Sequence, residues 1–599
     1  MKRTLFLLFL FIAAATFAKD VTEEQARRVA YQFWQSSPAT RGGTPVLQMV
    51  FHSEGLATRQ PGAAPAYYVF DNTAGPGFVV VAGDDVALPV LGYSFEHEFS
   101  ADRLPPNLKE WLEQLRQEVN DMRRDGVEAS ADVSRRWTST RAGAPVVKLE
   151  TARWNQAAPY NQLCPTVNGN STYTGCTATA LAIVMRYHRW PEKGVGTLPG
   201  YTTTTYQKPV SDLTLGHTYD WDNMLLDYPM TGYSQTAANA VATLMRDCGI
   251  MLQSDFCPIG SAGTAASISY IPPGLTTYMG YDKNIRAVPR DAYSATEWQQ
   301  LMADELDHNR PVLYTGANAE AGHAFVLDGY TDDYYFSVNW GWGGYCDGYF
   351  LLSAMDPEGQ GAGGSGSYNE GQYAVIGIQK DSGAGVQVEE LRFMKNVYEG
   401  YEYKGLSVGG EVRTGEPFTL YFGFLFNNGV AAFNGDLRLV MADRDGNWVE
   451  EFGQMAIEEL PAGYGYMSYG EFVIQSPILP GYRIRAYYRS VHNPEWKVVR
   501  GNEEEDCVWD LLIGDPYTIE ETTRLTYNKT SRLLKLQVKE GVTAQLHSAD
   551  GNDLSDLCRT QGNEISIDAS ALPGGTYRLT LRKGSEEKRL NLSLPDVTP

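Results

Sequence analysis

A cysteine at position 176 stands where a thiol could act as a nucleophile. It follows Gly175 and precedes a run of small and apolar residues, 177–185, that predicts a helix. At a helix N-terminus the unpaired N–H groups and the positive end of the dipole stabilise a thiolate and can hold an oxyanion. We therefore expect a lowered pKa for Cys176. The alternative is a small buried side chain packed on a helix.

A thiolate nucleophile needs a base, and the chain offers eight histidines. His188 lies on the same predicted helix, about 18 Å from Cys176 at about 1.5 Å per residue, which excludes it as the base. His323 precedes the apolar strand 324–329, so it lies at a strand end rather than inside an apolar core. The alternative is a strand-end histidine with a purely structural partner.

Asn339 ends the next predicted strand, and a turn at Asp332-Asp333 brings it to the same end of a hairpin as His323. An Asn amide there can accept the imidazole N–H and fix the tautomer, which leaves the other nitrogen for the thiol. Trp340 and Trp342 could shield that hydrogen bond from water. The Trp-Gly run alone is also typical of packing at a sheet corner, but its occurrence together with the Gly-Cys helix start favours a Cys-His-Asn site.

These motifs resemble the streptopain-like cysteine peptidases, which share the papain-like fold. The similarity rests on Trp154-Asn-Gln156 with Pro159-Tyr-Asn161, on 174–179, on Gly322-His-Ala-Phe-Val-Leu-Asp-Gly329, and on 338–344. The resemblance implies that Cys176 is the nucleophile, His323 the base and Asn339 the orienting residue. It implies further that Gln156 is an oxyanion donor beside the Cys176 N–H and that Trp340 covers the His-Asn pair. Protein substrates with an apolar residue two positions before the scissile bond would be hydrolysed, and neither metal nor cofactor is needed.

The N-terminal part of the chain predicts a small α+β unit that ends near residue 125. A capping box opens a helix over 22–34, the runs 66–70 and 77–82 predict a hairpin, and Pro105-Pro106 opens a second helix. Segments in this unit, among them 89–93 and 104–112, resemble the inhibitory propeptide of the same peptidases. The resemblance implies an intramolecular inhibitor over 19–143 and an enzyme made as a zymogen.

Residues 126–150 are small, polar and aperiodic, which predicts an exposed linker open to proteolysis. The resemblance marks Pro145-Val-Val-Lys148 as the start of the mature enzyme and places the cut between Arg141 and Ala144. The papain-like catalytic domain is then expected over 144–383. Its strands, predicted at 311–316, 324–330, 334–340, 348–353 and 373–379, form an antiparallel meander. The Gly/Ser stretch 356–368 is a connector or a mobile lid, and its position favours the lid.

Residues 1–18 carry Lys2 and Arg3, an apolar run and the small-residue ending Thr16-Phe17-Ala18, which predicts a secretory signal peptide. No later stretch reaches the roughly 20 apolar residues of a membrane span. The formal charge of -23, from 49 basic and 72 acidic residues, argues against nucleic acid and anionic membranes as partners. The seven cysteines are an odd number, so at least one is free, and without C-x-x-C spacing a zinc site is not expected.

After about residue 384 the chain alternates short strands and turns. A β-sandwich of the immunoglobulin-like type is expected over 384–518, and a second β domain over 519–599. The last domain is weakly similar to sorting tails of the Gram-negative type IX secretion route, although its ending differs from theirs. The sequence thus predicts a secreted α+β protein, with attachment to the outer cell surface as the alternative location.

Two other functions fit parts of the same sequence. An amidase or transpeptidase acting on cell-wall peptides would use the same Cys-His pair, and casein hydrolysis against release from wall peptide separates the two. An adhesin with a vestigial Cys-His domain would bind through the β tail. The complete Cys, His, Asn and Gln set argues against the adhesin.

Overall fold

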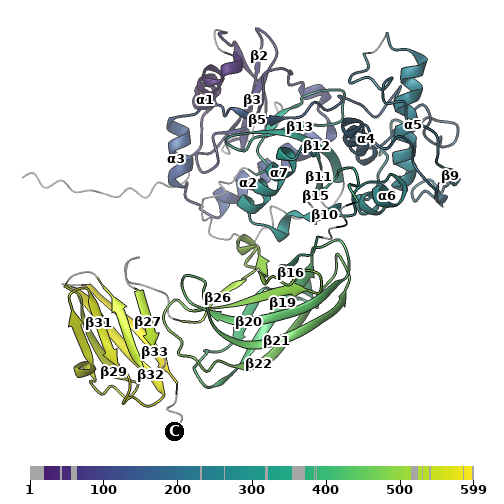
Figure 1. The fold of residues 1–599 in the computed structure, drawn as a ribbon. Coiled ribbons are helices and arrows are strands. Elements are labelled where there is room, and N and C mark those ends of the chain that lie inside the picture. Colours follow the sequence, from purple (N-terminus) through teal and green to yellow (C-terminus); the bar gives the residue numbers. More distant parts are fainter. Residues whose placement is uncertain are drawn as a thin grey trace, which may run out of the picture. The chain divides into compact units, whose positions relative to one another are not determined.

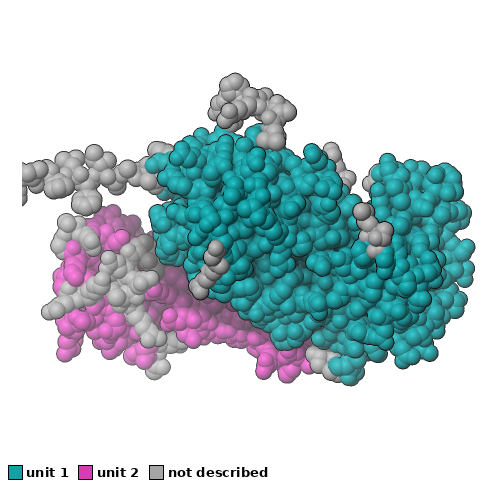
Figure 2. Space-filling model, turned by 90° about the horizontal axis from the view of Figure 1, so that it is seen from above, with its two compact units in different colours: residues 1–386 teal, residues 387–599 magenta. Residues whose placement is uncertain are grey.

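Two compact units, residues 1–386 and 387–599, make up the chain (Figure 2). The computed structural model describes residues 19–40, 43–54, 64–229, 232–261, 263–317, 322–353, 372–383, 385, 388–514, 524–528, 531–538, 541–583 and 586–595. The predicted signal peptide and the Gly/Ser stretch 356–368 lie outside these residues. The first unit mixes helices and strands, whereas the described part of the second consists of strands with two short 3-10 turns.

The N-terminal elements follow the sequence pattern. Helix α1 (Glu23–Ser36) begins at the predicted capping box of Thr22 and Gln25. Helix α2 (Pro106–Arg124) buries the predicted apolar face along its whole length. Strands β2 (Tyr67–Asn72) and β3 (Phe78–Ala82) form the predicted hairpin. Two flanking strands that the sequence did not predict, β1 (Leu47–His52) and β4 (Val90–Ser94), extend it.

One sheet runs through the whole first unit, in the order β1-β2-β3-β4-β14-β13-β12-β11-β15-β10, with β5 paired to β12. The later strands are β5 (Pro145–Lys148), β10 (Arg286–Pro289), β11 (Val312–Ala317), β12 (Gly322–Thr331), β13 (Phe336–Asn339), β14 (Gly348–Phe350) and β15 (Tyr373–Ile376). The two halves join where β4 pairs with β14, and a Cβ at Gly92 would lie 2.4 Å from the Phe350 ring. The predicted α+β unit is therefore continuous with the sheet of the peptidase region, and β4 covers an edge that β14 would otherwise expose.

The predicted meander is confirmed for β11 to β14, whose turn between β12 and β13 contains Asp332 and Asp333. Strand β15 departs from it and pairs with β11 and β10 instead of β14. Short two-residue hairpin strands lie outside this sheet: β6 (Thr197–Leu198) with β9 (Leu213–Thr214), and β7 (Tyr201–Thr202) with β8 (Pro209–Val210).

The prediction of an aperiodic linker over 126–150 was wrong. Helix α3 (Ala131–Thr138) forms there, with the Ser130 hydroxyl accepting from the Val133 N–H, and β5 follows it as a strand of the main sheet. Helix α3 buries only Val133, so it carries no apolar stripe by which a sequence could reveal it.

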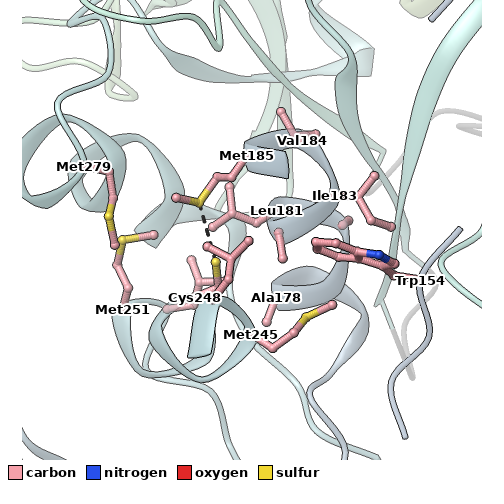
Figure 3. Packing of buried hydrophobic residues seen from close by; sticks show 14 of the residues in the cluster. Trp154, Ala178, Leu181, Ile183, Val184, Met185, Met245, Cys248, Met251 and Met279 are labelled. Atoms are coloured by element: carbon pink, nitrogen blue, oxygen red, sulfur yellow. Dashed lines mark hydrogen bonds between the residues drawn. The ribbon is translucent and has the colours of Figure 1, made fainter. Parts of the chain in front are cut away.

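Helix α4 (Cys176–His188) is buried from Thr177 to Met185 and packs against α5 (Gln235–Met251). Figure 3 shows Met185 of α4 facing Cys248 of α5, whose sulfur atoms lie 3.6 Å apart, with Trp154 against the same helix. Helices α6 (Ile271–Tyr278) and α7 (Ala295–Asp307) complete the unit. Figure 1 shows α4, α5 and α6 at one end of it and α1 and α3 at the other.

Strand β12 has different helices on its two faces. Ala324 and Val326 belong to the buried cluster around α4. Phe325 instead packs its ring against Trp111 of α2, at 5.7 Å between centroids. Since successive side chains of a strand point to opposite faces, α4 covers one face of β12 and α2 covers the other.

The second unit contains two buried cores. Two sheets share the first: β16 (Leu391–Tyr398), β17 (Tyr401–Lys404), β18 (Leu406–Gly409), β19 (Pro417–Asn427), β22 (Gly465–Val473) and β25 (Arg500–Gly501) in one, and β20 (Phe433–Ala442), β21 (Trp448–Leu460), β23 (Arg483–Ser490), β24 (Lys497–Val498) and β26 (Asp510–Leu512) in the other. The second core lies among β27 (Arg524–Asn528), β28 (Leu533–Gln537), β29 (Thr543–Ser548), β30 (Cys558–Gln561), β31 (Glu564–Asp568), β32 (Gly575–Lys583) and β33 (Glu586–Leu594). Within the described ranges, no helix has the length and apolar character needed to cross a membrane.

Candidate active site

Cys176 is the first residue of α4, as the sequence predicts. Gly175 precedes it with a φ of 87°, and a Cβ there would lie 2.7 Å from the Thr264 carbonyl oxygen, so only glycine fits without displacing the backbone. The Cys176 side chain is partly exposed, and Cys176 forms no disulfide. The thiol is therefore free and accessible at a helix N-terminus.

The electrostatics of Cys176 differ from the expectation. Burial raises the pKa of the thiol, and the backbone N–H of Ala324, the Thr177 hydroxyl and the nearby helix N–H groups only partly oppose it. The expected lowering of the Cys176 pKa is therefore wrong for this form of the chain. The helix N–H groups act in the predicted direction, but desolvation by the surrounding side chains is the larger effect.

His323 directly precedes Ala324 on β12, and the backbone N–H of Ala324 is among the groups that favour the Cys176 thiolate. The imidazole itself points to the other face of β12, where its Nε2 atom is 3.8 Å from Oε2 of Glu110 on α2. Burial lowers the pKa of His323, and its side chain is 27% exposed. The backbone thus brings the two predicted residues together, but in this form of the chain the imidazole is turned toward Glu110.

Helix α2 also contacts the Trp-Gly run. The amide of Asn107, a buried side chain, donates a hydrogen bond of 2.6 Å to the Trp340 carbonyl oxygen. A buried hydrogen bond of this kind fixes the start of α2 against the β13–β14 connection. The sequence did not predict the individual contacts of Asn107 and Glu110, although both lie in the segment 104–112 that resembles the inhibitory propeptide. Each of the two is a polar residue on the otherwise apolar, buried side of a helix, and this pattern in the sequence could have identified them.

Asn339 is buried, and both ends of its amide form hydrogen bonds. Nδ2 donates to the Thr151 hydroxyl at 3.0 Å and to the Ala152 carbonyl at 2.9 Å, while Oδ1 accepts from the Gly341 N–H at 3.1 Å. The expected hydrogen bond to His323 is not among the contacts of these two described residues. The register explains this, because Asn339 pairs with Val326, three positions from His323.

Trp340 is fully buried, with its ring 4.9 Å from that of Phe325. Its indole N–H donates to the Cys346 carbonyl, and its backbone N–H donates to the Asp347 carboxylate at 3.0 Å. Burial raises the pKa of Asp347 to about 7. Trp340 therefore packs directly behind the strand that carries His323, while Trp342 remains partly exposed.

Gln156 lies beside the start of α4. Its carbonyl oxygen accepts from the Thr174 N–H at 3.1 Å, two residues before Cys176. A second hydrogen bond, from the Gly343 N–H to the Trp154 carbonyl at 2.9 Å, ties the Trp-Gly run to the same segment. The fold thus gathers Cys176, His323, Asn339, Gln156 and Trp340 around one end of β12 and β13, while the assignment of a role to each stays a prediction.

The stretch in which the sequence places the maturation cut is held by the end of α1 and by the β12–β13 turn. The Ala142 N–H donates to the Ser36 hydroxyl, and the Ala144 N–H donates to Asp332, each at 2.8 Å. Ala142 and Gly143 are buried. A peptidase could reach this stretch only after local opening.

The comparisons with known proteins match this arrangement. The model of the Peptidase C10 family matches residues 154–350, and that of the Spi protease inhibitor matches residues 18–119. Streptopain of Streptococcus pyogenes is 32% identical over 396 residues, which cover 61% of this chain and 93% of streptopain. The chain belongs to the peptidase C10 family. By this membership it is a cysteine-type endopeptidase with an inhibitor-like segment ahead of the peptidase region.

Other relatives match over part of their own length or of this chain. The thiol protease/hemagglutinin PrtT of Porphyromonas gingivalis is 35% identical over 379 residues, which cover 61% of this chain and 42% of PrtT. This C10 chain therefore spans less than half of that relative. The solved structure of a Prevotella intermedia prointerpain A fragment is 29% identical, with a TM-score of 0.45, and its match covers 56% of this chain and 99% of the fragment.

Proposed function

We propose that the chain is the precursor of a secreted, papain-like cysteine endopeptidase that acts through Cys176 and His323. The observation that carries this proposal is the position of Cys176 at the N-terminus of α4, which packs on β12 next to Ala324, the residue that follows His323. A turn of the His323 side chain from the α2 face of β12 toward α4 would join the two groups. Family membership supports the same pair.

In the proposed reaction, His323 takes the proton of Cys176 and the thiolate attacks the carbonyl carbon of a peptide bond. The Cys176 N–H and the Gln156 amide stabilise the oxyanion of the tetrahedral intermediate. The imidazolium protonates the leaving amine, and water then hydrolyses the acyl-enzyme with His323 as base. Asn339 accepts the second imidazole N–H, and Trp340 excludes water from that hydrogen bond.

The N-terminal segment keeps this pair apart in the precursor. The imidazole lies on the α2 face, with its Nε2 atom 3.8 Å from the Glu110 carboxylate, and Asn107 fixes α2 on the segment of Trp340. Release of α2 frees His323 and returns water to the cleft, which restores the ordinary pKa values of both groups. The inhibitor-like segment is in this proposal an intramolecular inhibitor, and its removal by a cut between Arg141 and Ala144 activates the enzyme.

Replacement of Cys176 tests the proposal. A Cys176→Ala precursor should hydrolyse casein at the background rate and keep its full mass during incubation. Cys558→Ala removes the other partly exposed cysteine, which lies in the second unit, and should retain parental activity and processing. Persistent casein hydrolysis by purified Cys176→Ala protein would refute the proposed nucleophile.

The location and the maturation cut are tested on the natural product. Culture fluid should contain a protein whose N-terminal residue lies between Ala142 and Ala144. Its mass then shows whether the two expected β domains, 384–518 and 519–599, are kept. A mature N-terminus before residue 142 would contradict the proposed cut.

A further inference from the structure

A chain of hydrogen bonds behind Asn339 has no part in the chemistry described so far. Asp328 lies on β12, five residues after His323, and is 2% exposed. Its Oδ1 atom accepts from the Lys148 ammonium and its Oδ2 atom accepts from the Thr151 hydroxyl, each at 2.5 Å. The Leu149 N–H also donates to the Asp328 carbonyl at 2.6 Å. Asp328 is thus held by the segment 148–151 on both its side chain and its backbone.

The chemistry of this chain fixes which way the Asn339 amide points. A hydroxyl has a single proton, and Thr151 gives its proton to the Asp328 carboxylate, which has none to offer. The Thr151 oxygen can then only accept, as can the Ala152 carbonyl, so both must face the Nδ2 end of Asn339. The Oδ1 end is therefore directed to the other side, where Gly341 uses one of its two lone pairs. The hydrogen-bond partners alone therefore distinguish the nitrogen of the Asn339 amide from its oxygen.

We infer that Thr151 and Asp328 are positioning residues, which hold the carbonyl oxygen of Asn339 toward the imidazole of His323. The inference rests on the proposed function. A flipped amide would present N–H donors to the imidazolium and destabilise it, whereas the fixed oxygen accepts its N–H. Lys148 balances the charge of Asp328, because an unpaired buried carboxylate would be costly. Neither Thr151 nor Asp328 touches the reacting atoms.

The test is a double-mutant cycle on Thr151 and Asn339 in the full precursor. Each variant is matured by tagged parent enzyme, which is then removed, and rates are normalised to reactive thiol. Thr151→Val should lower kcat about 10- to 100-fold with KM within about twofold, since a misplaced orienting group acts on the reacting geometry. The alkaline limb of the kcat/KM profile should move to lower pH, because the imidazolium has lost its acceptor.

Two comparisons separate positioning from a general loss of packing. Thr151→Ser keeps the hydroxyl and should restore kcat and the alkaline limb. In an Asn339→Ala background, Thr151→Val should have no further effect. Thr203→Val removes a buried hydroxyl far along the chain, which accepts from the Lys208 N–H, and should leave kcat unchanged. If Thr151→Val protein does not fold, Asp328→Asn takes its place in the cycle with the same expected results.

Additive effects in the cycle, an unmoved alkaline limb, or equal impairment by serine and valine at position 151 would overturn the inference. These outcomes presuppose a parent enzyme with thiol-dependent peptide hydrolysis. Absence of that activity in the parent would instead refute the proposed function. The two failures are therefore distinguishable in one set of measurements.

Discussion

The Asn339 amide has hydrogen-bond partners on the side of Thr151 and Ala152 but none from the His323 imidazole among the described contacts. Toward Thr151 and Ala152 every donor of the amide has its acceptor, whereas toward His323 the imidazole is turned away to Glu110. Thr151 and Ala152 follow residue 144, whereas Glu110, which lies beside the imidazole, precedes residue 141. The two sets of groups therefore lie on either side of the proposed cut, so in the proposed function one cut removes α2 and leaves the support of Asn339 in place.

The largest effect should come from removing the proposed base, His323. His323→Ala should lower kcat/KM for peptide hydrolysis by about 100- to 10,000-fold, because general base catalysis contributes that much. The measurement is hydrolysis of a fluorogenic peptide by protein matured in trans. His308→Ala removes an exposed histidine of the same unit and should keep the parental rate. Equal rates for His323→Ala and the parent would assign the base to another group.

A smaller effect is expected from loosening α2. Asn107→Ala removes the buried hydrogen bond to the Trp340 carbonyl, which should cost about 1–3 kcal/mol of docking free energy. Self-processing of the precursor, followed by mass, should be about tenfold faster. Lys109→Ala changes an exposed position of the same helix and serves as the control. Slower processing of Asn107→Ala than of the control would show that α2 assists the peptidase rather than blocking it.

The pH dependence of thiol reactivity sharpens the same comparison. Burial raises the pKa of Cys176, so at neutral pH the precursor carries less thiolate than an ordinary cysteine, and the thiolate is the reactive form. In a His323→Ala precursor, which cannot process itself, alkylation by iodoacetamide should rise only at alkaline pH. Adding Asn107→Ala should move this rise to lower pH. Mass spectrometry of the Cys176 peptide measures the rate, and half-maximal reactivity below pH 8 in the docked precursor would contradict a desolvated thiol.

The smallest effect on peptide hydrolysis is expected from a substitution in the second unit, because its ion pairs lie on a β-sheet and not at the candidate active site. Arg485 donates to both carboxylate oxygens of Asp510, at 2.6 and 3.0 Å. Arg485→Ala should lower the free energy of unfolding of that unit by about 1 kcal/mol and leave peptide hydrolysis within about twofold of the parent. Calorimetry gives the first value and the fluorogenic assay the second. A large loss of hydrolysis would show that the β tail contributes to the reaction.

Local patterns predicted several elements correctly. The capping box of Thr22 and Gln25, the apolar stripe of α2 and the Gly-Cys start of α4 each depend on neighbours in the sequence, so they can be identified without tertiary contacts. Helix α3 and strand β5 were missed for the opposite reason. Their stability comes from partners far along the chain, such as the Ala87 carbonyl that accepts from the Trp137 indole N–H.

The candidate site divides in the same way. Motif spacing identified Cys176, His323 and Asn339 as a group, and the fold gathers them at one end of β12 and β13. The orientation of the imidazole, the raised pKa of Cys176 and the support by Asp328 could not be predicted. Each depends on groups more than 60 residues apart in sequence, such as Glu110 and His323, or Lys148 and Asp328.

The sequence alone determined which chemical groups this chain possesses and which short elements begin or end beside them. Only the tertiary structure decided that the N-terminal strands continue the peptidase sheet and that the His323 imidazole lies beside Glu110 of α2. The physical reason is the distance along the chain between the interacting residues. Caps, turns and apolar stripes are set by residues within about one or two helical turns of one another. Desolvation, side-chain direction and buried hydrogen-bond chains depend on residues that are distant in the sequence and become neighbours only in the folded chain.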